Sequence, residues 1–280
     1  MTTHRVERHV LGPWSLATCK AFWEGFTPAA LSTTGGDPLT TVFLVEADWS
    51  RSEAVVVQQG GTARIEVTGD GDLAAAAAQV ARFLALDVDA TGWPAVGERD
   101  PVIAELQARL PGFRPCGFHS PYEAAVWAVL SQRIRIPQAA ALRSRLADRY
   151  GDRGAMPAPA VLRGLDLDLP GRKAEYLHAV ADAALDGLLD GERLRALPTA
   201  EALTAVQEVQ GLGPFAAQLV VVRGANTQDV APRRERRLDE QIVERYGPGA
   251  TIDVVSEAWR PFRTWAAVHL RAAAEVPLER

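Results

Sequence analysis

The sequence has few of the residues that mark several common protein classes. Only two of its 280 residues are cysteines, Cys19 and Cys116, and they lie far apart in the sequence. This excludes a four-cysteine zinc or iron–sulfur site and gives no sign of a disulfide framework. A run of 18 apolar residues is also lacking, so we expect no membrane span. The opening MTTHRVERHV has no apolar core of a signal peptide, and we expect a cytoplasmic protein.

An excess of basic residues is lacking too. The net charge is −5 at pH 7, so a nucleic-acid-binding face would have to be local. No phosphate loop for a nucleotide cofactor, zinc-ligand spacing or serine-elbow motif is present, and we expect no metal site. Apolar residues make up 48% and charged residues 23%, as in ordinary globular chains. The length allows one large domain or two ordinary ones.

The first 92 residues carry the β-strand signals. Three β-branched runs, at 38–50, 53–59 and 63–69, are separated by RS and GG, which are typical of hairpin turns, and RVERHV near the start favours a further strand. Asp72 opens DLAAAAAQVARFLAL, a helix by propensity and spacing. These patterns predict a small antiparallel sheet with helices on a face.

From Trp93 onward the patterns are helical. The strongest helix start is SPYEAAVWAVLSQRIRI, where Ser120 is the cap, Pro121 takes the first helical position and Glu123 completes a capping box. Further helical patterns run to the C-terminal VSEAWRPFRTWAAVHLRAAAE. We therefore predict an α+β protein, with an N-terminal α+β domain over residues 1–92 and an all-α domain over residues 93–280.

A two-glycine turn divides two of these helices in LTAVQEVQGLGPFAAQLV. Gly211 and Gly213 form the turn and Pro214 begins the next helix. Glycines suit a backbone with positive φ or one that another molecule approaches closely. The free N–H groups of a helix start, together with the helix dipole, favour an anion such as a DNA phosphate. The alternative is a tight connection between two packed helices.

Beyond the turn, one acid stands among basic residues. Glu235 is flanked by arginines which, if exposed, would bind DNA phosphates: Arg233, Arg234, Arg236 and Arg237. The alternative is that Glu235 pairs with one of these arginines on a solvated helix start.

Several motifs, in order along the chain, resemble those of the helix-hairpin-helix DNA glycosylases, most of all the bacterial 3-methyladenine DNA glycosylases of type II. The motifs are FHSPYEAAVWAVLSQRI, LPGRKAEYLHAVADAAL, the G-L-G turn with Phe215, the following R-G and D-V, and WRPFRTWAAVHL. The resemblance covers nearly the whole chain and implies an all-α helix-hairpin-helix glycosylase domain behind the N-terminal sheet domain.

The resemblance also assigns roles to residues of the site. An ungapped count from Phe215 puts the family's catalytic aspartate position on Glu235, whose carboxylate would stabilise positive charge on the deoxyribose and activate water. Phe215 takes the place of the lysine that forms a Schiff base in glycosylases that also cut the strand, which implies a monofunctional enzyme. Phe22 and Phe215 would line the base pocket, although core packing is an alternative for each. Arg271 falls where the family has a pocket aromatic.

The segment SQRI corresponds to the loop that fills the gap left by a flipped base. Gln132 and Arg133 occupy it, and the alternative for Arg133 is an exposed loop arginine.

The function expected from this resemblance is base-excision repair. A monofunctional DNA glycosylase would flip alkylated purines of the 3-methyladenine type out of duplex DNA, hydrolyse the glycosidic bond and leave an abasic site. The alternatives are a non-catalytic DNA-damage-binding protein of the same fold and a glycosylase for a different lesion. We expect a monomer near the nucleoid, with double-stranded DNA as partner. No cofactor is expected beyond a structural monovalent cation at the hairpin carbonyls, which would suit the family.

Overall fold

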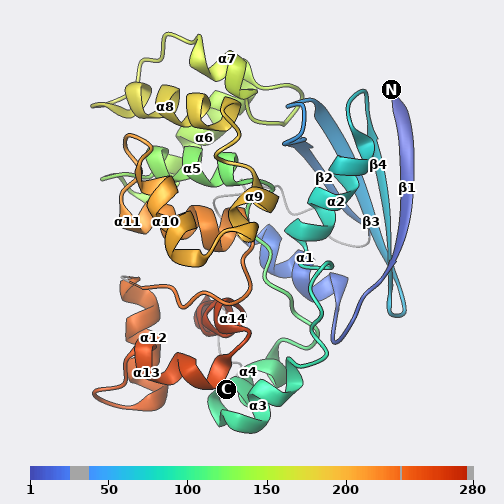
Figure 1. Cartoon of the computed structure of the whole chain (residues 1–280), viewed down its shortest axis with the longest axis vertical. Helices are drawn as coiled ribbons and strands as arrows, with labels where there is room; N and C mark the ends of the chain where they lie inside the picture. Colours follow the sequence, from blue (N-terminus) through green and yellow to red (C-terminus); the bar gives the residue numbers. More distant parts are fainter. Residues whose placement is uncertain (26–37, 234, 276–280) are drawn as a thin grey trace.

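A computed structural model describes residues 1–25, 38–233 and 235–275 of the chain, and an antiparallel sheet fills its N-terminal part (Figure 1). The strands are β1 (Thr2–His9), β2 (Leu39–Leu44), β3 (Arg51–Gln59) and β4 (Thr62–Gly69), in the order β1-β4-β3-β2. β3 and β4 form the hairpin expected around GG, with Gln59 opposite Thr62. The strand expected over residues 38–50 ends at Leu44, because a turn formed by a backbone bond from Trp49 to Val45 follows.

Two helices accompany the sheet. Helix α2 (Leu73–Phe83) begins as predicted at Asp72, whose carboxylate accepts from the N–H of Ala75 at 2.9 Å. Helix α1 (Leu16–Glu24), which we did not predict, begins at Ser15. The sheet and both helices bury one shared core, which includes Leu16, Trp23, Phe43, Val56, Ile65, Val80 and Phe83.

Beyond β4 the described part of the chain contains helices and no strand, as expected. They are α3 (Pro94–Arg99), α4 (Pro101–Arg109), α5 (Pro121–Leu130), α6 (Ile136–Tyr150), α7 (Pro159–Arg163), α8 (Lys173–Leu185), α9 (Gly191–Ala196), α10 (Thr199–Gln207), α11 (Pro214–Leu219), the π-helical turn η2 (Val220–Gly224), α12 (Arg236–Tyr246), α13 (Ile252–Val255), the 3₁₀ turn η3 (Ser256–Trp259) and α14 (Arg263–Glu275). The α+β class is therefore confirmed.

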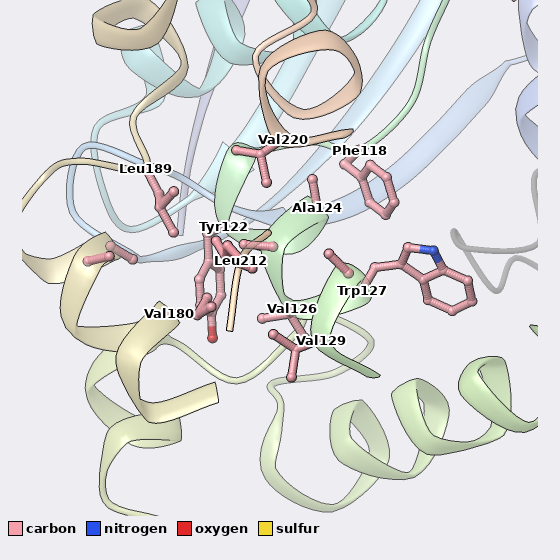
Figure 2. Packing of buried hydrophobic residues seen from close by; sticks show 14 of the residues in the cluster. Phe118, Tyr122, Ala124, Val126, Trp127, Val129, Val180, Leu189, Leu212 and Val220 are labelled. Atoms are coloured by element: carbon pink, nitrogen blue, oxygen red, sulfur yellow. The ribbon is translucent and has the colours of Figure 1, made fainter. Parts of the chain in front are cut away.

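Helix α5 is the centre of the helical part, and every one of its residues is buried. Ser120 caps it as predicted, accepting from the N–H of Glu123 at 3.1 Å. The Glu123 carboxylate turns to His119 and Arg143 instead of closing the capping box. Figure 2 shows Leu212, from the two-glycine turn, among the buried side chains around α5, so the turn is fixed to the core by its middle residue.

The C-terminal segment is two elements, not the one helix that the pattern predicted. η3 ends at Trp259 and α14 begins at Arg263, because Pro261 has no N–H to donate and disfavours helical backbone at Arg260. Helix α14 then packs through Val268 and Ala272 against Cys19 of α1 and against Phe113. This contact brings the N-terminal and C-terminal parts of the chain together.

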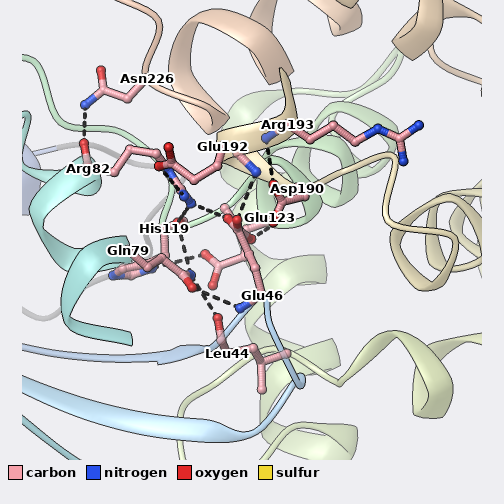
Figure 3. A network of polar contacts seen from close by, with 12 residues as sticks. Leu44, Glu46, Gln79, Arg82, His119, Glu123, Asp190, Glu192, Arg193 and Asn226 are labelled. Atoms are coloured by element: carbon pink, nitrogen blue, oxygen red, sulfur yellow. Dashed lines mark hydrogen bonds and ion pairs between the residues drawn. The ribbon is translucent and has the colours of Figure 1, made fainter. Parts of the chain in front are cut away.

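A buried polar network also joins the sheet part to the helical part (Figure 3). Arg82 of α2 pairs with Glu46 after β2 and with Glu192 of α9. Glu46 accepts from the N–H of Gly191 at 2.9 Å, and Asn226 donates to the carbonyl of Arg82 at 2.7 Å. The boundary that we expect at residues 92–93 stays a prediction.

Candidate active site

A cavity of about 180 Å³ opens where α1, α11, η2 and α14 meet. An apolar cavity of about 150 Å³ is enough for a benzene ring, so this one has room for an aromatic ring of a base. All four residues expected at the acid and the base pocket line it, although they lie far apart in sequence. The lining residues are Phe22, Phe215, Gln218, Leu219, Val222, Arg223, Pro232, Glu235, Ala267, Val268 and Arg271.

One wall comes from α11 and η2. Pro214 takes the first position of α11, and Phe215 follows at the lip of the cavity with 54% of its surface exposed. At the end of this wall the helix widens into a π turn, where the N–H of Ala225 donates to Val220 at 2.8 Å. π turns of this kind occur often at functional sites. Gly224 closes the turn where a Cβ would meet Pro121 and Ala124 of α5 at under 3 Å, so only glycine fits there.

The acid also lines the cavity, from the segment before α12. Glu235 immediately precedes α12, and its carbonyl accepts from the N–H groups of Leu238 and Asp239 at 2.9 and 3.0 Å. Its carboxylate does not cap that helix. Instead, Oε1 lies 2.7 Å from Nε of Arg271 on α14, with 30% of the glutamate side chain and 19% of the arginine side chain exposed. Among the residues that the structure describes, the ion-pair partner of Glu235 is thus Arg271 on another helix and not Arg233, Arg236 or Arg237.

Phe22 both lines the cavity and packs against the core, and its role in a base pocket stays a prediction. Its ring lines the cavity and packs 4.7 Å from the ring of Phe113 between centroids. The guanidinium of Arg223 lies 5.6 Å from the centre of the Phe22 ring and donates to the carbonyl of Cys116. A cation over an aromatic face is attractive, so this stack stiffens one side of the cavity.

The two-glycine turn lies beside the expected inserting loop. Gly211 has φ +91°, and the side chain of Gln132 donates to its carbonyl at 2.7 Å. Lys173, which is buried, donates from Nζ to the carbonyls of Val129 and Gln132 at 2.8 Å each. Burial lowers the pKa of Lys173. Gln132 therefore holds the loop against the turn.

Arg133 lies at the tip of this loop. It is exposed and has φ +56°, a left-handed conformation that non-glycine residues seldom adopt. An inserting role for Arg133 is compatible with this exposure and stays a prediction.

The basic cluster is exposed as far as it is described, while Arg234 lies outside the described residues. Arg233 pairs with Asp253 at 2.7 Å, and Arg236 pairs with Glu240 at 3.5 Å. Arg237 is exposed on the first turn of α12. No side chain in the described residues caps α11, so the N–H groups of its first turn are left to water or a ligand. Phosphate binding by these groups stays a prediction.

Sequence reasoning missed several residues of the cavity. Gln218, Leu219 and Val222 follow Phe215 by three, four and seven positions, so they lie on its face of the helix. Ala267 precedes Arg271 by one helical turn in the same way. Helical periodicity from the two predicted pocket positions would have identified them.

Within the described ranges, no cluster of three or more candidate metal ligands is present, and no helix has the length and apolar character to cross a membrane.

No protein-family model matches the chain. It is 30% identical over 186 residues to DNA-3-methyladenine glycosylase 2 of Escherichia coli. That alignment covers 60% of this chain and 63% of the relative, so the chain spans less than two thirds of that protein's length.

Solved structures show the same fold. A 3-methyladenine DNA glycosylase from Archaeoglobus fulgidus superposes with a TM-score of 0.73 at 18% identity, covering 95% of this chain and 97% of that one. The Schizosaccharomyces pombe 3-methyladenine DNA glycosylase in complex with abasic DNA gives a TM-score of 0.52 at 24% identity, over 62% of this chain and 91% of that one. In sequence and in fold, the chain is therefore similar to the 3-methyladenine DNA glycosylases.

Proposed function

We infer that the protein is a monofunctional DNA glycosylase that removes alkylated purines of the 3-methyladenine type from duplex DNA. One observation carries the proposal: Glu235 and Phe215 line the same cavity, next to a helix start suited to a phosphate. The similar proteins from Escherichia coli and Archaeoglobus fulgidus, which are 3-methyladenine DNA glycosylases, support the same activity. The partner is double-stranded DNA with a damaged base, bound by a monomeric protein at the nucleoid.

The arrangement supports a hydrolytic mechanism. A flipped base enters the cavity and stacks on Phe215, because a cationic alkylated base gains from an aromatic face. As the glycosidic bond breaks, positive charge develops on the deoxyribose, and the carboxylate of Glu235 stabilises that charge and orients the attacking water. No lysine lines the cavity in the described residues, so there is no amine for a Schiff base and the product is an abasic site.

The test is base release from methylated duplex DNA. Wild-type protein releases free methylated purine, and Glu235→Gln lowers the single-turnover rate about 10²-fold or more, because the amide cannot stabilise a cation. The matched control is Glu244→Gln, an exposed carboxylate on α12 that is hydrogen-bonded to Gln241. It keeps the wild-type rate. Strands break only after alkali treatment; breakage without alkali would rule out a monofunctional enzyme.

A second candidate function is supported by the Glu235–Arg271 ion pair. A carboxylate that is already neutralised by an arginine is less able to stabilise a sugar cation. This suits a protein that binds damaged DNA without releasing the base. This candidate predicts tight binding to a duplex with an abasic-site analogue and no base release from any lesion. Release from methylated DNA that depends on Glu235 would exclude it.

A further inference from the structure

The ion pair in the cavity joins two departures from the resembled family. The acid is a glutamate where the family has an aspartate, and the side chain on α14 is Arg271 where the family has an aromatic residue. The two meet at 2.7 Å between Nε and Oε1. The glutamate has a longer side chain than an aspartate, and Arg271 supplies a guanidinium that pairs with its carboxylate.

The backbone around Arg271 is held in place by the packing of its neighbours on α14. Helix α14 is packed on both sides of this residue, by Leu270 and Ala272, which are buried. His269, also buried, hydrogen-bonds to the carbonyl of Trp265 and contacts the rings of Trp93 and Phe113. The guanidinium therefore projects from a fixed backbone.

The segment that carries Glu235 is tied to the same helix at a second point. The N–H of Val230 donates to Oγ1 of Thr264 at 3.1 Å, and the N–H of Thr264 donates to Gln228 at 3.0 Å. Arg263 pairs with Asp229 at 2.8 Å. These bonds fix residues 228–230, and the N–H of Arg233 donates to Oε1 of Gln218 on α11 at 2.9 Å. They hold the backbone of the segment and do not contact the side chain of Glu235.

Three of the described arginines around Glu235 have other partners. Arg223, across the cavity on η2, lies over Phe22 and donates to Cys116. On the acid's own segment, Arg233 pairs with Asp253 and Arg236 with Glu240. Within the described part of the chain, Arg271 is the cation that lies against the Glu235 carboxylate.

We propose that Arg271 is a positioning residue that holds the Glu235 carboxylate over the cavity, and that the two residues work as a matched pair. The proposal rests on the glycosylase function proposed above. A carboxylate one methylene longer than aspartate reaches about an ångström further, and a misplacement of that size can cost about 10² in rate. The arginine removes this error by fixing the end of the side chain.

The test is a double-mutant cycle on single-turnover base release from methylated duplex DNA, with Arg271→Ala, Glu235→Asp and the double variant. Arg271→Ala lowers the release rate about 10²-fold, while the Kd for a duplex with an abasic-site analogue stays within about threefold of wild type. Arg271→Lys recovers part of the rate, because it restores a cation. Glu235→Asp costs at least about fivefold less in the Arg271→Ala background than in wild type, since the length of the acid matters only while its anchor is present.

The control is Arg195→Ala, which breaks a remote ion pair with Asp87 of similar exposure, 20% and 23% for the two side chains. It leaves release unchanged. An Arg271→Ala protein that folds and releases base at the wild-type rate or faster would overturn the proposal, as would additive effects in the cycle. If wild-type protein releases no base at all, it is the proposed function that fails.

Discussion

Two glycines of one turn differ in what surrounds them. Gly211 has φ +91°, and a Cβ there would lie 2.4 Å from Cγ of Tyr176. Gly213 has φ −79°, and a Cβ there would meet nothing within 4 Å. The fold therefore explains the first glycine, whereas the second leaves room for a molecule that approaches from outside.

Alanine at the two positions is expected to affect two different properties, stability at Gly211 and DNA binding at Gly213. Gly211→Ala lowers the free energy of unfolding by about 2 kcal/mol or more, because it adds a strained backbone and a clash. Gly213→Ala changes that free energy little and weakens duplex binding severalfold, because its methyl group occupies the side open to a phosphate. Urea unfolding and fluorescence anisotropy with labelled duplex measure the two quantities. Unchanged DNA binding by Gly213→Ala would remove this helix start from the proposed interface.

At the scale of elements, α14 carries one side of the cavity and is held by the residues on its other faces. His269 is fully buried, and burial lowers its pKa to about 4 from an ordinary value of 6.5. The imidazole is therefore neutral in the folded protein at pH 7. Its Nδ1 donates to the carbonyl of Trp265 at 2.8 Å, within the helix.

This burial makes stability depend on pH. Between pH 4 and 6.5 the unfolded chain binds more protons at residue 269 than the folded one, so the free energy of unfolding falls as pH falls through that window. From pH 7 to pH 5 this contribution is about 1–2 kcal/mol. His269→Phe keeps an aromatic ring in place and loses this part of the pH dependence. Urea unfolding of both proteins at pH 7 and 5 measures this difference. An equal drop in the free energy of unfolding in the wild type and in His269→Phe would show that His269 is not the cause.

At the scale of the whole molecule, one buried arginine ties distant segments together. Arg114 is fully buried and donates to the carbonyls of Leu11, Pro13, Ala85 and Val88. These acceptors belong to the segment before α1 and the segment after α2. The same guanidinium lies 5.4 Å from the ring centre of Trp265 on α14. Arg114 thus holds the N-terminal part against the helix that carries Arg271.

Loss of this guanidinium should destabilise the whole protein. Arg114→Met removes a donor from four carbonyls, of which that of Leu11 also accepts from the N–H of Ala90, and lowers the free energy of unfolding by about 3–5 kcal/mol, which corresponds to roughly 10 °C in Tm. Arg5→Met, which breaks an exposed pair with Glu66, changes Tm little. Thermal unfolding followed by circular dichroism compares the two variants. A wild-type Tm for Arg114→Met would contradict the role of Arg114 as a tie.

Local patterns predicted the elements well where the signal lies within a few residues. Ser120 and Asp72 start their helices as expected, and the GG turn joins two strands. The patterns missed α1 and the break at Pro261, which tertiary packing and a single proline decide.

The site was predicted as separate residues, because motif resemblance places each one along the chain. The structure brings Phe22, Phe215, Glu235 and Arg271 to one cavity. The partner of Glu235 was not predictable from its neighbours in sequence, because Arg271 reaches it from another helix. An ion pair between elements depends on how those elements pack.

Phe22 gives the N-terminal part a share in the cavity, while the two-glycine turn and the basic segment lie wholly in the helical part. Under the function proposed above, selection of the base and binding of the DNA backbone would therefore depend partly on different segments. Substitutions in α1 would then change which bases are accepted during evolution and leave the proposed backbone-binding surface unaltered.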